Sequence, residues 1–200
     1  MKLLYNSYDL PQKWKKYEYV LSGYRMNYSI RCAFFSIFDH RHNEFWMIWS
    51  DICPCILYII MFINWFFFHN PIEKINNHYI SIAYIGIIIS RICSVIYHVF
   101  NCISMDMNHK LIYIDYIGIT HIILGAPWLY INTKNKNIYI YILVCIIGYI
   151  ICITRYIYTL LYNKNNKYDQ ILLILLEFIG NYPSFIIILG KEYMIEWKIN

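Results

Sequence analysis

Three residues of this sequence have types and spacing suited to chemistry in a hydrophobic environment: Ser94, His98 and Asp115. Ser94 precedes His98 by four residues, which places both side chains on one face of a helix. An imidazole can bind zinc, a carboxylate can orient a metal-bound water molecule, and a hydroxyl group can steady either of them. The pattern is therefore compatible with a metal site that uses His98 and Asp115, with Asp115 and Ser94 as candidate catalytic residues.

The same residues also have a purely structural interpretation. Seventeen positions separate His98 from Asp115, enough for a short turn that lets the two side chains face each other at one depth of a helical hairpin. A hydrogen bond between them would hold the hairpin together without any metal. Zinc sites usually have three protein ligands or more, so these two candidates alone leave both interpretations open.

The elements that must position these residues are predicted to be membrane-spanning helices. The 200-residue chain is 60% apolar and 14% charged, which does not fit a water-soluble domain. Five apolar stretches, separated by polar breaks, are each long enough to cross a hydrocarbon core of ~30 Å as a helix. They are residues 48–68, 80–100, 111–131, 138–158 and 171–189. The predicted fold class is all-α, a polytopic transmembrane helix bundle.

The distribution of charge predicts the domain organisation and the orientation. We expect a cytoplasmic N-terminal region at 1–44, a transmembrane helical domain at 45–190 and a short tail at 191–200. With the N-terminus in the cytoplasm, eleven lysines and arginines lie on that side and five on the other, as the positive-inside rule favours. The net charge of +5 is too diffuse to indicate a nucleic-acid partner. The predicted partner is the lipid bilayer, which the chain crosses several times.

Ionisable residues within the spans are informative because each costs ~2.5–3.5 kcal/mol to insert. The spans hold His98, Asp115, Asp51, Arg91, His121 and Glu177. Asp51 and Arg91 are predicted to form a buried ion pair between the first two spans. His121 lies six residues after Asp115, about 240° around the helix, and is expected to point away from the same metal. The polar run at 40–44 precedes the first span and is interpreted as a packing element, not a metal cluster.

Four spaced blocks of the sequence resemble the progestin and adipoQ receptor family, which includes the adiponectin receptors and the bacterial hemolysin III-type proteins. The resemblance covers about residues 17–130 well and thins beyond them. The blocks are Gly23-Tyr24-Arg25, then Ser36-Ile37-Phe38 with His42-Asn43-Glu44 and Trp49, then Ser94-Val95-Ile96-Tyr97-His98, and finally Asp115-Tyr116-Ile117-Gly118-Ile119.

This resemblance implies a seven-helix membrane protein with a cytoplasmic N-terminus and an intramembrane zinc ion. It implies His98 as a zinc ligand, Asp115 as a residue acting through zinc-bound water, and Ser94 as their support. It further implies either a receptor or a zinc-dependent hydrolase of lipid amides such as ceramide.

The sequence also departs from the family pattern. After His-Asn-Glu the family continues Asn-x-Trp-Thr-His, where this chain has Met47-Ile48-Trp49-Ser50-Asp51. The family's other zinc ligands are two histidines of a seventh span, whereas residues 131–200 contain no histidine. We therefore expect a sequence truncated after its fifth helix, with an incomplete set of ligands. The alternative function is a non-catalytic membrane scaffold that lacks the complete zinc site.

Overall fold

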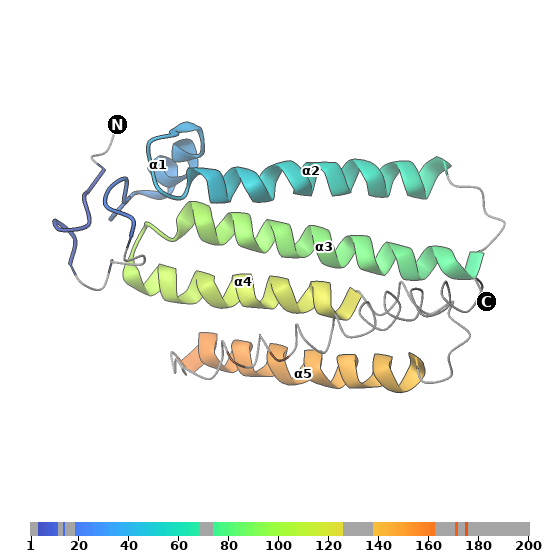
Figure 1. Ribbon diagram of the computed structural model, residues 1–200. Helices are drawn as coiled ribbons and strands as arrows, with labels where there is room; N and C mark the ends of the chain where they lie inside the picture. The colour runs from blue at the N-terminus through green and yellow to red at the C-terminus, as the bar shows by residue number, and fades with distance from the viewer. Residues whose placement is uncertain are drawn as a thin grey trace, which may run out of the picture. The chain divides into compact units, whose positions relative to one another are not determined.

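The computed structural model describes residues 4–11, 14, 19–68, 74–125, 138–162, 171 and 175. Within these ranges the regular structure is helical, apart from one isolated bridge between Tyr5 and Tyr24, which confirms the predicted all-α class. The elements are α1 (Ile30–Phe35), the short 3-10 helix η2 (Ser36–Phe38), α2 (Phe45–Phe68), α3 (Lys74–Phe100), α4 (Met105–Gly125) and α5 (Ile138–Tyr162) (Figure 1).

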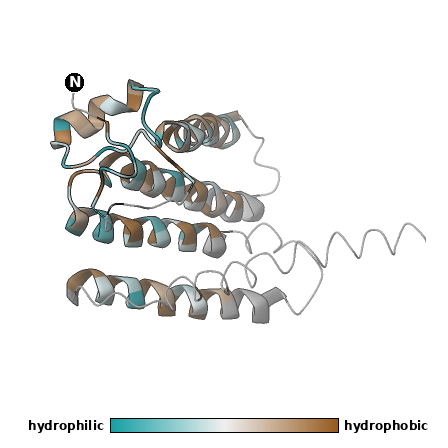
Figure 2. Cartoon of the chain, turned by 60° about the vertical axis from the view of Figure 1, so that its left-hand side comes forward, coloured by the Kyte–Doolittle hydropathy of each residue, from teal (hydrophilic) through white to brown (hydrophobic). Residues whose placement is uncertain are grey.

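Four of the five predicted spans correspond to α2, α3, α4 and α5. The fifth, at 171–189, lies outside the described residues except for Ile171 and Leu175, both of which are helical. Within the described part of the chain, Phe45–Phe68 and Ile80–Phe100 are long and apolar enough to cross a membrane, and Cys145–Leu161 is a shorter apolar helix. Hydrophobic residues make up much of each helix, whereas the connection from α1 to α2 is mainly hydrophilic (Figure 2).

The chain divides into two compact units. The first comprises Met1–Met61 and Ile88–Gly118, and the second comprises Phe62–Ile87 and Ile119–Asn200. Ser94, His98 and Asp115 all belong to the first unit, which therefore contains the whole candidate site.

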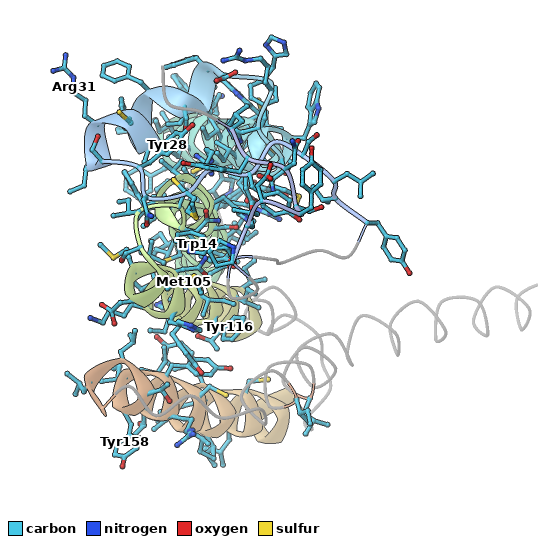
Figure 3. The ribbon with its side chains drawn as sticks, turned by 90° about the vertical axis from the view of Figure 1, so that its left-hand side faces the viewer. Trp14, Tyr28, Arg31, Met105, Tyr116 and Tyr158 are labelled. Atoms are coloured by element: carbon cyan, nitrogen blue, oxygen red, sulfur yellow. The ribbon has the colours of Figure 1, made fainter. Side chains whose placement is uncertain are left out.

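The first unit is built around small hydrophobic clusters that join distant parts of the sequence. Leu10, Trp14 and Tyr24 are buried together, with Met105 of α4 packed against them (Figure 3). Ile37 of η2, Ile48 of α2 and Val99 of α3 form a second buried cluster. These contacts hold the N-terminal segment and the short helices against the start of α2, the end of α3 and the start of α4.

Helices α3 and α4 approach each other closely at Gly118. A Cβ atom at this position would lie 2.7 Å from Cys93 Cβ and 3.1 Å from Ser90 Cα, so the packing has no room for a larger residue. Asp115 precedes Gly118 by three residues and so shares its helix face. The close approach therefore directs Asp115 toward α3.

The second unit has its own contacts. Phe62 and Trp65 of α2 lie against Tyr84 of α3, with ring centroids 6.0 and 6.3 Å apart. In the same unit, His121 of α4 lies 3.2 Å from the hydroxyl oxygen of Tyr149 in α5.

Candidate functional site

The His98 imidazole contacts the carboxyl group of Glu44, the residue directly before α2. Its Nδ1 atom lies 2.8 Å from Glu44 Oε2, and both side chains are buried. Asn101 Nδ2 is 3.4 Å from the other oxygen of the same carboxylate. A carboxylate that accepts the Nδ1 proton fixes the orientation and tautomer of a histidine, so that the Nε2 lone pair faces outward from the pair.

Arg25 holds this arrangement from the N-terminal side. Its Nη2 atom donates to the backbone oxygen of His98 at 2.6 Å, and its Nη1 atom donates to Ser36 Oγ at 2.6 Å and to the Val99 oxygen at 3.3 Å. The last carbonyl groups of a helix have no partner inside the helix. Arg25 supplies this partner at the end of α3 and is itself buried, which lowers the pKa of its guanidinium group.

Gly23 and His42 determine the path of the chain into Glu44. Gly23 has a φ of +84°, and a Cβ atom there would lie 2.8 Å from the oxygen of Arg41, so both conformation and space require glycine. The Gly23 oxygen accepts a hydrogen bond from the Asn43 amide at 3.0 Å. His42 Nε2 donates to the Ser36 oxygen at 2.8 Å, and its Nδ1 accepts from the Glu44 amide at 3.2 Å.

The buried environment of His42 affects its protonation. The pKa of His42 is lowered from 6.5 to about 4, mainly by desolvation and next by the positive charge of Arg25, while the bond to Ser36 and the charges of Asp39 and Glu44 oppose the shift. The neutral ring matches its two hydrogen bonds, one donated and one accepted. These contacts confirm that the run at 40–44 packs the start of α2.

A second group of polar side chains lies deeper between the helices. Arg91 Nη1 is 2.7 Å from Asp51 Oδ1, which confirms the predicted ion pair. Ser94 Oγ donates to the other oxygen of Asp51 at 2.8 Å. The Asp51 side chain is buried, whereas that of Arg91 is 37% exposed. The carboxylate is therefore held by both a cation and a hydroxyl group.

Asp115 joins this second group from α4. Its carboxyl group interacts with the Ser94 hydroxyl group and electrostatically with His98, Arg91 and Asp51. We call Arg25, Glu44, His98 and Asn101 the histidine cluster, and Asp51, Arg91, Ser94 and Asp115 the aspartate cluster. One turn of α3, from Ser94 to His98, separates the two clusters by about 6 Å along the helix.

The structure thus brings the three sequence candidates together between α3 and α4. The sequence predicted Asp115 within the first turns of its helix, whereas α4 begins at Met105, ten residues earlier. Ser104 Oγ accepts from the Met107 amide at 3.1 Å and caps this earlier start. Asp115 interacts with both the Ser94 hydroxyl group and, electrostatically, His98. Ser94 donates to Asp51, a partner that the sequence did not indicate.

A sequence model of the haemolysin-III related family matches residues 39–197, which is most of the chain and includes both clusters except Arg25. The chain belongs to the haemolysin-III related family. It is therefore a membrane protein of this family, and its helices lie in a lipid environment.

Two curated relatives show how this family member aligns with longer proteins. It is 31% identical over 126 residues to heptahelical transmembrane protein 1 of Arabidopsis thaliana, covering 59% of this chain and 38% of the relative. It is 30% identical over 128 residues to the adiponectin receptor protein of Drosophila melanogaster, covering 61% of this chain and 28% of the relative. The chain thus spans less than half the length of either relative.

The family resemblance implies zinc, and the residues of this haemolysin-III related protein fit part of a zinc site. The carboxylate on Nδ1 of His98 is the arrangement that usually supports a metal-binding histidine. Asp115 adds a second potential donor one turn away. Among the described residues, however, no group of three or more histidine, cysteine or acidic side chains is arranged to hold a metal ion. His121 contacts Tyr149 in the other unit, and Glu177 lies outside the described residues.

Proposed function

We propose that this chain contributes His98 and Asp115 to a zinc-dependent hydrolase site within the membrane, acting on lipid amides such as ceramide. The observation that carries the proposal is the 2.8 Å contact between Glu44 Oε2 and His98 Nδ1. Because that contact occupies Nδ1, His98 would bind the metal through Nε2. A complete site needs further ligands beyond these two residues.

Zinc, when bound, would polarise the amide carbonyl group and acidify a water molecule. The residues of this chain would have separate tasks. Asp115 would hold that water molecule and accept its proton, since its carboxyl group faces the His98 side of α3. Ser94 would position Asp115, and the ion pair of Asp51 with Arg91 would hold Ser94 in place.

A small cavity lies beside the histidine cluster. It has a volume of about 10 Å³ and is bordered by Arg25, Glu44 and Asn101, together with Trp14, Tyr24 and Asn43. This volume is about the minimum that holds one water molecule. The buried Nε atom of Arg25 has no hydrogen-bond partner in the described part of the chain and can donate to such a molecule.

A second candidate function is a non-catalytic membrane scaffold, with a receptor role as one version of it. The observation that favours it is that each cluster already contains a contact between helix-positioned polar side chains, Glu44 with His98 in one and Asp51 with Arg91 in the other. Such pairs can hold helices together in a bilayer without any metal.

Zinc titration of the detergent-purified chain distinguishes the two functions. We expect about one weakly bound zinc ion per chain in the wild type and loss of this binding in His98→Ala. His109→Ala, which removes an exposed imidazole from α4, serves as the matched control and should bind as the wild type does. Identical binding in all three proteins, or no binding at any zinc concentration, would favour the scaffold. Hydrolysis of a fluorescent ceramide by the same proteins then tests the substrate class.

A further inference from the structure

A cavity of about 550 Å³ lies beside α1 in the first unit. The residues that line this cavity do not include His98, Glu44, Asp51 or Asp115, so the cavity is separate from the proposed zinc site. Its charged lining residues are Arg31, Asp39, His40 and Arg41. All of them precede α2, and none has a part in the chemistry proposed above.

The wall of this cavity carries an excess of positive charge. Arg41 is bound to Asp39 by two parallel contacts, from Nε to Oδ1 at 2.8 Å and from Nη2 to Oδ2 at 2.9 Å. The Arg31 guanidinium group lies over the ring of Phe35, 5.9 Å from its centroid, and no carboxylate of the described residues pairs with it. Figure 3 shows Arg31 extending away from the ribbon. Arg31 is thus a positive charge without an acidic partner among the described residues.

The rim of the cavity is hydrophobic and exposed. Phe35 and Phe38, which line it, are 59% and 69% exposed, and Ile30 at the start of α1 and Trp46 at the start of α2 are 65% and 77% exposed. Large exposed apolar patches mark contact surfaces. This patch adjoins α2, an apolar helix long enough to cross a membrane, because the ring centroids of Phe38 and of Trp49 in α2 lie 6.3 Å apart. A bilayer leaflet that surrounds the start of α2 would therefore also contact Phe38 and Trp46.

We propose that this cavity binds the headgroup of an anionic phospholipid from that leaflet. Arg31 binds the phosphate group, since a guanidinium group matches phosphate with two parallel hydrogen bonds. Phe35 and Phe38 contact the glycerol and the first carbons of the acyl chains. The net positive wall favours an anionic lipid over a zwitterionic one, because each cation at a membrane surface attracts anionic lipid by ~1 kcal/mol, a factor of about five.

Native mass spectrometry of the detergent-purified full chain tests this site. The protein is titrated separately with phosphatidylglycerol, phosphatidylcholine and inorganic phosphate. We expect a saturable adduct with phosphatidylglycerol that Arg31→Gln weakens about fivefold. Lys110→Gln is the matched control, because it also removes one exposed positive charge in the same unit, where Lys110 pairs with Asp106. Phe38→Gln tests the hydrophobic rim and should weaken the same adduct.

Several results would overturn the proposal. Equal binding of phosphatidylglycerol and phosphatidylcholine would remove the electrostatic argument, and equal losses in Arg31→Gln and Lys110→Gln would show general charge attraction. Binding of inorganic phosphate that displaces the lipid would assign the site to a soluble anion. Circular dichroism and gel filtration of each variant verify its fold, so that a loss of lipid binding reports on the cavity itself. Zinc content is measured on the same samples and is expected to be unchanged.

Discussion

Glu44 Oε2 and His98 Nδ1 lie 2.8 Å apart although 54 positions separate the residues in sequence. The contact joins the start of α2 to the end of α3 and fixes the ring of the candidate metal ligand. Both side chains are buried, so removing either one leaves a buried polar group without its present partner. The orientation of His98 therefore depends on Glu44.

Replacing Glu44 by glutamine is expected to weaken zinc binding by about 10- to 100-fold, the usual effect of removing the partner of a metal-bound histidine. Asp106→Asn is a suitable control, because it removes an exposed carboxylate that pairs only with Lys110 four residues later. Zinc affinity is measured by competition with a chromophoric chelator. Equal affinity of Glu44→Gln and the wild type would show that Glu44 does not orient a metal ligand.

Local sequence patterns predicted some of this site and missed the rest for physical reasons. Helix geometry predicts that Ser94 and His98, four residues apart, share one helix face. The cost of burying charge in lipid predicts that Asp51 and Arg91 need partners. The role of Glu44 depends on an irregular segment shaped by the positive φ of Gly23, which no periodic pattern records. For Glu44, the one available signal in the sequence was that a buried histidine needs an acidic partner.

The start of the helix that carries Asp115 was predicted too late for a related reason. Hydropathy placed the helix start at residue 111, where the apolar stretch begins. The preceding, more polar residues 105–110 are also helical, because Ser104 caps them. Hydropathy reports where a helix enters lipid, whereas capping determines where the helix begins.

The ion pair of Asp51 with Arg91 is expected to couple the two residues energetically. Asp51→Asn and Arg91→Gln should each lower the free energy of unfolding by about 1–3 kcal/mol, less than a fully buried pair, because Arg91 is partly exposed. The double variant should lose less than the sum of the single losses. Unfolding by sodium dodecyl sulfate in mixed micelles, followed by circular dichroism, provides the four values. Strict additivity would show that the contact contributes no coupling.

Gly118→Ala is expected to separate α4 from α3 and thereby displace Asp115. The new Cβ atom would lie 2.7 Å from Cys93 Cβ, closer than carbon atoms pack, so a helix must shift. Removing the obstructing atom in Gly118→Ala with Cys93→Gly should restore part of the loss, although the Ser90 backbone still lies at 3.1 Å. Thermal unfolding of the single and double variants checks this. A double variant no more stable than Gly118→Ala would assign the loss to another cause.

The stability of the first unit is expected to fall as the pH decreases from 6.5 toward 4, because of His42. Its pKa is about 4 in the folded protein, compared with 6.5 when unfolded, because desolvation and then Arg25 disfavour the charged ring. Between these values the unfolded chain takes up the proton and the folded chain does not, so unfolding becomes progressively easier as the pH decreases. The contribution is complete above pH 6.5 and is lost as the pH falls to about 4.

His42→Gln should therefore give a melting temperature that depends less on pH over this range. His40→Gln, on an exposed residue two positions earlier, should keep the dependence of the wild type. The melting temperature of each protein is followed by circular dichroism at several pH values in the same detergent. If His42→Gln kept the full dependence, another group would be responsible, and the buried neutral ring would not explain acid sensitivity.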